Sequence, residues 1–173
     1  TGILHGWHNR GSSGESQFPG ITGVDRRMER LHLEIVTGER IVSSQDVDVI
    51  VAPGEDGELT VLAGHAPLLT TLKPGEMLVT AEGDVSYIAI SGGFLEVLAN
   101  KVIVLADTAE RSDEIDIDRA EAALKRAQDA VIDKPEQVNL SMALASIRKS
   151  QARVKVARRR TRLAKGIGSK GSA

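Results

Sequence analysis

Hydrophobic residues change their spacing near Ser112, and this change divides the chain into two kinds of structure. From Arg30 to about residue 106, apolar side chains alternate with polar ones, which is the period of strands that bury one face. After Ser112 they recur at intervals of three and four residues, the spacing of an amphipathic helix. We therefore expect a β-rich body followed by a helical tail.

The body is predicted to consist of short strands with no helices between them. Alternation marks 30–36 and 46–51, and turns rich in Gly, Pro and Asp separate five further candidates. Short strands joined by closely spaced turns are typical of an antiparallel sandwich or barrel. The five further candidates are 58–63, 76–82, 85–91, 93–98 and 101–106.

The tail is predicted to form two helices that pack as an antiparallel hairpin. The first helix has an apolar stripe made mostly of alanine, and Asp133-Lys134-Pro135 interrupts it. The second helix should continue to about Ala164, before Gly166 and Gly168 end it. Because alanine side chains bury little apolar area, such a hairpin would be held weakly and could open.

These patterns divide the chain into four segments. Residues 1–27 are rich in Gly and Ser and have no hydrophobic period, so we expect a disordered extension there. Residues 28–112 should form the β-sandwich and 113–165 the helical hairpin. Residues 166–173 should form a flexible tail.

Charge is distributed unevenly, although the net charge is only −2. Residues 28–112 contain fourteen Asp and Glu against five Lys and Arg, whereas 137–173 contain ten Lys and Arg and no acidic residue. A basic helix of this kind could bind nucleic acid or an acidic protein surface. The tail has no aromatic residue on which bases could stack, which counts against nucleic acid.

Residue patterns that usually carry catalysis are missing or isolated. The chain has no cysteine, no phosphate-binding loop, no zinc-binding helix motif and no nucleophile elbow, and Ser146-x-x-Lys149 lacks its companion motifs. The four histidines do not have metal-ligand spacing. No apolar run approaches the roughly 18 residues of a spanning helix. We therefore expect a non-catalytic binding protein that meets a membrane only through a partner.

Two motifs leave alternatives open. His65, between Gly64 and Pro67, could cap a turn or contact a partner. Asp116 could be an N-cap paired with Arg119, or both residues could bind a nucleotide. Spacing alone favours the structural interpretation in both cases.

Several motifs resemble those of the epsilon subunit of bacterial and chloroplast F1Fo ATP synthases. They are Gly57-Glu58-Leu59, GHAPLLTTLKPG from Gly64 to Gly75, SGGFLEV from Ser91 to Val97 and VLADTAE from Val104 to Glu110. The similarity covers about 28–165. It implies an all-β sandwich of about ten strands followed by a C-terminal antiparallel helical hairpin. The subunit would be non-catalytic and would sit at the foot of the central stalk, turning with the rotor.

The resemblance also implies partners. The sandwich would contact the gamma subunit and the c-ring, with Glu58 and His65 near the ring. The hairpin would extend along gamma among the alpha and beta subunits and inhibit ATP hydrolysis. Such a subunit lies at the cytoplasmic face of the bacterial plasma membrane. The arginines that would contact beta are Arg153, Arg158, Arg159, Arg160 and Arg162. The alternatives are a nucleic-acid-binding adaptor and a stand-alone nucleotide sensor.

Regulatory ATP is a further implication, although no cofactor is required. Some bacterial members bind ATP through an [IL]-D-x-x-R-A motif, which this chain matches in full. In the second helix our register puts Ile147 and Gln151 where the family has arginines, so we expect weak binding or none. The nucleotide-binding residues implied are Glu110, Ile115, Asp116, Arg119, Ala120 and Arg148.

Overall fold

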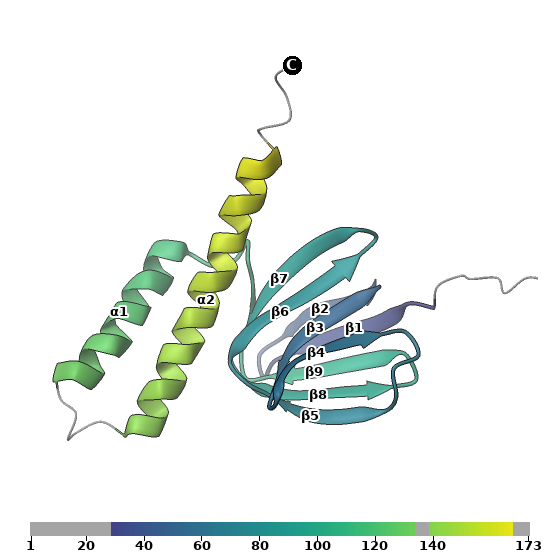
Figure 1. Ribbon diagram of the computed structural model, residues 1–173, viewed down its shortest axis with the longest axis horizontal. Helices are drawn as coiled ribbons and strands as arrows, with labels where there is room; N and C mark the ends of the chain where they lie inside the picture. The colour runs from purple at the N-terminus through teal and green to yellow at the C-terminus, as the bar shows by residue number, and fades with distance from the viewer. Residues whose placement is uncertain (1–28, 134–138, 168–173) are drawn as a thin grey trace, which may run out of the picture.

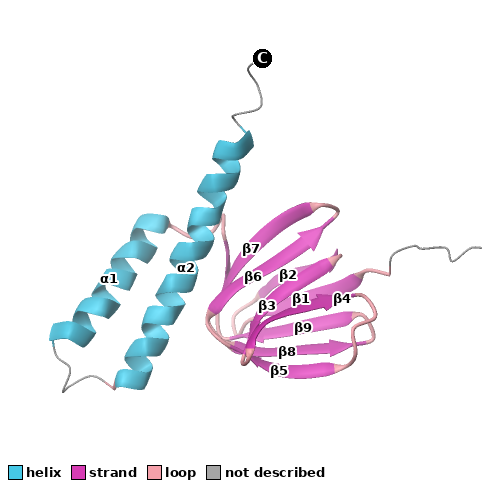
Figure 2. Cartoon of the chain, viewed as in Figure 1, coloured by secondary structure: helices cyan, strands magenta, loops and turns pink. Residues whose placement is uncertain are grey.

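The computed structural model of the chain describes residues 29–133 and 139–167, with side chains described as far as Ile132 and from Asn139 to Arg159. The predicted extension at 1–27 lies outside the described residues. Ten strands come first and two helices follow (Figures 1 and 2). The order of strands and helices is the predicted one; the residue pattern alone predicts seven strands, and the family resemblance implies about ten.

The strands are short and follow one another closely, and the helices are the last two elements. The strands are β1 (Leu31–Val36), β2 (Ile41–Val47), β3 (Val49–Gly54), β4 (Gly57–Leu62), β5 (Leu68–Leu72), β6 (Gly75–Ala81), β7 (Asp84–Ile90), β8 (Gly93–Leu98), β9 (Lys101–Ala106) and β10 (Ala109–Arg111). The helices are α1 (Ile117–Asp133) and α2 (Leu140–Ile167). The second helix therefore continues a few residues beyond its predicted end.

Hydrogen bonds join the strands in the order β10-β7-β6-β3-β5-β8-β9-β1-β2, with β4 paired to β3 off this path. The sheet folds over on itself into two layers (Figure 1). The prediction of a purely antiparallel arrangement is wrong at one place, because β1 and β9 pair in parallel. Parallel neighbours need a long connection, and the seven strands between β1 and β9 supply it.

The prediction of one strand over 46–51 is also wrong, because β2 ends at Val47 and β3 begins at Val49. The chain turns at Asp48, whose main-chain amide donates to the Thr80 carbonyl at 2.8 Å and whose carboxylate accepts from the Glu82 amide at 2.7 Å. Val47 is buried before this corner, but Ile50 rather than Val49 is buried after it. A one-residue shift exchanges the two faces of a strand, so the continuous alternation concealed the corner.

The core between the layers is aliphatic, as the low aromatic content requires. Its fully buried side chains come from the strands of both layers, and within the part of the chain that the structure describes none of them is aromatic. Burying a side chain of this size stabilises the fold by about 1.5–3 kcal/mol. The largest of them are Leu31, Leu33, Ile35, Ile50, Met77, Ile90 and Leu95.

The helical hairpin packs on one side of the sandwich. Helix α2 lies between α1 and the sheet, where it contacts β6 and β7 (Figure 1). A second, smaller apolar cluster forms there from Ala89, Ile115, Ala120, Val154, Val156 and Ala157. Among the described residues, neither helix is long and apolar enough to cross a membrane. The cluster joins α2 and the start of α1 to β7, and the weak packing between the two helices stays a prediction.

Candidate functional site

Two basic side chains of α2 converge on one carboxylate of β6. Arg159 donates to both oxygens of Glu76, from Nε and Nη2 at 3.1 Å each, and the Lys155 ammonium lies 3.2 Å from Oε1. The Glu76 side chain is only 8% exposed. A two-pronged guanidinium contact is among the strong, geometrically specific hydrogen bonds of proteins. The helix thus covers a buried acid and supplies the cations that compensate it.

Arg159 makes a further contact with β7. Its guanidinium lies 5.2 Å from the centre of the Tyr87 ring, within cation–π range. The hydrogen bonds that Arg159 donates to Glu76, and then the negative charge of Glu76, raise the pKa of Arg159, so the contact favours the charged form that arginine always has in proteins. The same guanidinium links α2 to two neighbouring strands.

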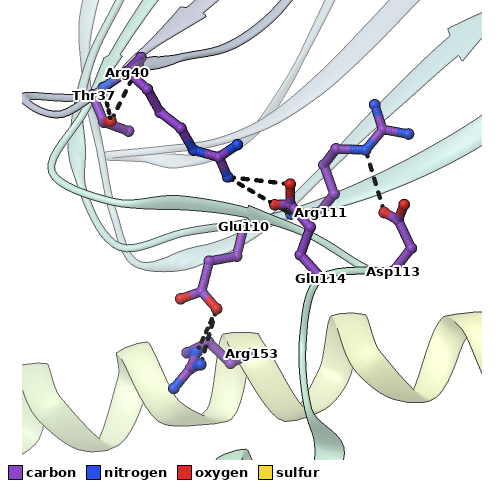
Figure 3. Close-up of polar contacts among 7 residues, drawn as sticks. All are labelled: Thr37, Arg40, Glu110, Arg111, Asp113, Glu114 and Arg153. Atoms are coloured by element: carbon purple, nitrogen blue, oxygen red, sulfur yellow. Dashed lines mark hydrogen bonds and ion pairs between the residues drawn. The ribbon is translucent and has the colours of Figure 1, made fainter.

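A second ion pair joins α2 to β10 (Figure 3). Arg153 donates to Glu110 Oε2 from Nε at 3.1 Å and from Nη2 at 2.9 Å. At about 100° per residue, Arg153 and Arg159 are separated by roughly 120° around the helix, and Val156 lies between them. Val156 is fully buried. The two arginines therefore flank the apolar stripe by which α2 meets the sheet.

The third described arginine of the basic cluster pairs with the first helix. Arg158 donates to Glu121 at 2.8 Å, and both side chains are well exposed. Of the arginines predicted to contact the beta subunit, Arg153, Arg158 and Arg159 have described side chains. In this conformation each of them is paired with a carboxylate of the chain itself. The side chains of Arg160 and Arg162 lie outside the described residues. The acidic body and the basic tail were the sequence signal for the pairs of Arg153 and Arg159, but opposite charge alone does not show that the tail pairs within its own chain.

The linker between sandwich and hairpin is also fixed by charge (Figure 3). Arg40, in the turn between β1 and β2, donates to the two carboxylate oxygens of Glu114 at 3.2 and 3.0 Å. Glu114 also accepts a bond from the main-chain amide of Arg111 at 3.2 Å. These contacts fix where the chain leaves β10 to begin α1.

The predicted nucleotide motif forms the start of α1. Asp116 is the N-cap, because its Oδ1 accepts the main-chain amide of Arg119 at 3.0 Å. Asp116 therefore caps the helix, as the structural interpretation predicts. The partner of its carboxylate is the main-chain amide of Arg119 and not the Arg119 side chain. Ile115 and Ala120 are buried in the small cluster, and Glu110 is paired with Arg153 as described above.

Arg148 lies apart from that motif. It lines a hollow of about 200 Å³ together with Glu76, Lys155 and neighbouring residues, and none of the four motif residues lines it. A larger hollow of about 380 Å³ lies between the two helices, lined by Leu124 and by Lys155, Arg158 and Arg159 among others. The structure therefore brings Glu110 and Arg153 together near the linker but does not add Arg148 to them.

The two predicted c-ring contacts lie at opposite ends of β4. Glu58 is exposed near the start of this strand, and His65 follows its end in the turn before β5. The His65 amide donates to the Leu62 carbonyl at 3.0 Å, and Nδ1 lies 2.7 Å from the Ala66 carbonyl. His65 thus has the geometry of a turn residue. The strand runs four residues from Glu58 to Leu62, about 13 Å at about 3.3 Å per residue, before the turn that carries His65, so the two side chains lie at different ends of β4.

An exposed apolar row that the sequence pattern did not predict lies on the outer face of the sheet. The register aligns Phe94 of β8 with Leu105 of β9, Leu105 with Val36 of β1, and Val36 with Ile41 of β2. Phe94, Leu105 and Ile41 are 54%, 55% and 66% exposed. We call these four residues the apolar row. Contiguous exposed apolar residues mark interaction sites. The signal for the row in the sequence was that its members stand next to Leu95 and Val104, which are buried, and therefore point outward.

Comparison with known proteins identifies both parts of the chain. Residues 30–112 match the family described as "ATP synthase, Delta/Epsilon chain, beta-sandwich domain", and residues 113–158 match its "long alpha-helix domain". The ATP synthase epsilon chain of Desulforamulus reducens is 46% identical over 125 residues, which cover 72% of this chain and 95% of the relative. That of Dehalococcoides mccartyi is 48% identical over 134 residues, which cover 77% and 96%.

A solved structure shares the fold. A chain of the Euglena gracilis mitochondrial ATP synthase, in an assembly of OSCP, F1 and c-ring, superposes with a TM-score of 0.57 at 22% identity, over 87% of this chain and 86% of that chain. At this identity the likeness concerns the fold alone. The two family matches together span most of the chain, and the relatives are matched over nearly their whole length. The chain therefore belongs to the ATP synthase delta/epsilon family and is a non-catalytic subunit of that enzyme.

Proposed function

We propose that this chain is the central-stalk subunit of a bacterial F1Fo ATP synthase that couples rotation of the c-ring to ATP synthesis. The observation that carries the proposal is the uninterrupted family match, with the sandwich at 30–112 followed directly by the helical domain at 113–158. Its partners would be the gamma subunit and the c-ring below, and alpha and beta above. It would lie at the cytoplasmic face of the plasma membrane, bound through the complex.

The apolar row supplies a docking surface on the sandwich for gamma. Its side chains project from neighbouring strands, so they present a continuous rigid patch rather than scattered apolar residues. Phe94, at the β8 end of the row, is the only aromatic member, and aromatic anchors are the kind of residue that dominates binding energy. We place gamma on this face and leave Glu58 and His65, at opposite ends of β4, as separate candidates for the c-ring.

Reconstitution tests this role. Membranes depleted of the subunit should regain proton-driven ATP synthesis when the chain is added back. Phe94→Asp should bind the depleted complex about thirtyfold more weakly, because a lost hot spot costs about 2 kcal/mol or more. Val85→Asp makes the same change at an exposed residue of β7 away from the row and should behave like the unmodified chain. Failure of the unmodified chain to restore synthesis would contradict the proposed role.

The basic helix is proposed to inhibit ATP hydrolysis by contacting beta. Arg153, Arg158 and Arg159 can make that contact only after leaving Glu110, Glu121 and Glu76. The folded hairpin would therefore be the permissive state and a released α2 the inhibitory one. The nucleic-acid alternative has no support from the family, and these cations are already paired within the chain.

Regulatory ATP is proposed to bind at the start of α1, where Arg119 is exposed beside the capping Asp116. Asp116→Ala should destabilise α1 by about 1 kcal/mol through loss of the cap, whether or not ATP binds. If ATP binds, it should raise the melting temperature of the unmodified chain and of Asp118→Ala, but not that of Asp116→Ala. Thermal melts with and without millimolar ATP measure this. An unmodified chain that does not respond would leave Asp116 as a cap alone.

A further inference from the structure

Three segments meet at the end of the sandwich that carries His65. They are the segment before β1, the turn from β4 to β5 and the turn from β8 to β9, and Asn100 in the last of them contacts both others. Its Oδ1 accepts the main-chain amide of Gly64 at 2.7 Å, and its Nδ2 donates to Glu29 Oε2 at 2.8 Å. Its carbonyl oxygen accepts the His32 amide at 2.8 Å. One residue therefore joins three segments that lie far apart in the sequence.

The backbone at Asn100 belongs to a two-residue hairpin loop. Ala99 and Asn100 link the paired residues Leu98 and Lys101, and their φ angles are both positive, at 47° and 63°. Positive φ at both positions is what a type I′ turn requires, and glycine is the usual residue at the second of them. A glycine would therefore serve the loop at least as well as Asn100. The loop does not need the Asn100 side chain, so the two side-chain hydrogen bonds must serve something else.

The residue that donates to Asn100 has little means of fixing its own conformation. Gly64 has a φ of +78°, and a Cβ there would meet nothing within 4 Å. Glycine adopts positive and negative φ about equally readily. His65 follows directly, and its amide donates to the Leu62 carbonyl at 3.0 Å within the same turn. The bond from Gly64 to Asn100 ties this turn to a neighbouring hairpin and so limits the conformations that are open to it.

We propose that Asn100 is a positioning residue, which holds the turn at 64–67 in the shape in which His65 meets the c-ring. It acts through the Gly64 amide, and the bond to Glu29 orients its side chain. This inference rests on the proposed function, because it takes His65 as a contact in the complex. A turn that is ordered before binding loses less conformational entropy on association. The Asn100 side chain should therefore raise affinity without being needed for folding.

Asn100→Gly removes both side-chain bonds and keeps a backbone that suits the loop. In the full-length isolated chain, the melting temperature should stay close to that of the unmodified chain. Exchange of the Gly64 amide with water, followed by NMR, should become about fivefold faster, the factor that one ordinary hydrogen bond contributes. Ala99→Gly is the matched control, because it changes the same loop and leaves the contacts of Asn100 in place. It should leave the exchange of Gly64 unchanged.

Titration of membranes depleted of the subunit measures the effect on binding. His65→Ala and Asn100→Gly should each weaken binding about fivefold, again the factor of one hydrogen bond. The double variant should bind little more weakly than either, because both substitutions act through one turn. Ala99→Gly should bind like the unmodified chain.

A rescue variant tests whether the hydrogen bonds themselves position the turn. Combining Glu29→Gln with Asn100→Asp exchanges donor and acceptor, because the new amide can donate to the new carboxylate. That carboxylate can still accept the Gly64 amide. The combined variant should therefore restore both the slow exchange of Gly64 and the affinity of the unmodified chain.

The positioning role is overturned if Asn100→Gly binds as tightly as the unmodified chain, if it leaves the exchange of Gly64 unchanged, or if its effect adds in full to that of His65→Ala. It also fails if the rescue variant binds no better than Asn100→Gly, or if His65→Ala binds normally, since the turn would then not be a contact. The proposed function is judged separately, by whether the unmodified chain restores ATP synthesis. The two failures are therefore distinguishable.

Discussion

Gly93→Ala is expected to destabilise the sandwich by about 4 kcal/mol or more, which is a large fraction of the 5–15 kcal/mol of a typical domain. Gly93 begins β8, where it pairs with Leu72 of β5 and with Ala106 of β9. Its φ of +128° is one that L side chains rarely adopt. An added Cβ would lie 2.0 Å from the Leu105 carbonyl oxygen and 2.9 Å from the Ala106 Cα. Both are main-chain atoms of a paired strand, so relief requires β8 and β9 to separate.

Urea unfolding followed by circular dichroism measures this effect. Gly83→Ala is the control, because Gly83 also has a positive φ, of +87°, but a Cβ there would meet nothing within 4 Å. That variant carries only the cost of the left-handed backbone, about 1–2 kcal/mol. A loss in Gly93→Ala no larger than that in Gly83→Ala would show that β9 can move aside and that the close approach is unimportant.

Ending the chain after Asp133 is expected to raise ATP hydrolysis by the assembled enzyme at least about fivefold, the lower range of typical allosteric coupling. The truncation removes α2 and with it every described cation proposed to contact beta. It also removes Val154, Val156 and Ala157 from the small cluster, so α1 should lose its packing and its helicity. The sandwich should remain folded, because its core contains no helix residue.

Hydrolysis by the complex reconstituted with each chain is the measurement. A chain ending after Ile167 retains the whole of α2 and should inhibit as the unmodified chain does. Circular dichroism of the isolated truncated chain checks that the sheet survives. Hydrolysis that is unchanged by the loss of α2, with the truncated subunit still bound, would contradict an inhibitory role for this helix.

Much of the fold could be predicted because the spacing of apolar residues along the chain indicates which side chains are buried. The period-two segments became strands and the alanine-rich stripes became helices. The corner at Asp48 escaped because Val47, Val49 and Val51 continue a pattern that the backbone does not follow. Strand β5 escaped because Leu69 points outward, 72% exposed, so the segment lacked a clear alternation.

The site was harder to predict because its contacts join residues far apart in the chain. Glu76 and Arg159 are 83 residues apart, and Glu110 and Arg153 are 43 apart. Local spacing contains no information about such pairs. The opposite charges of body and tail were visible in the sequence, but charge alone cannot distinguish an external partner from an internal one. Only the position of α2 against β6, β7 and β10 shows that the chain pairs with itself.

Affinity purification of the full-length chain from gently solubilised membranes shows whether the chain is a subunit of the ATP synthase rotor. Mass spectrometry would identify and quantify the proteins recovered with it at moderate salt. We expect gamma and the c subunit in fixed proportion to the chain, together with alpha and beta. Recovery of the chain without ATP synthase subunits, either alone or with nucleic acid, would contradict it.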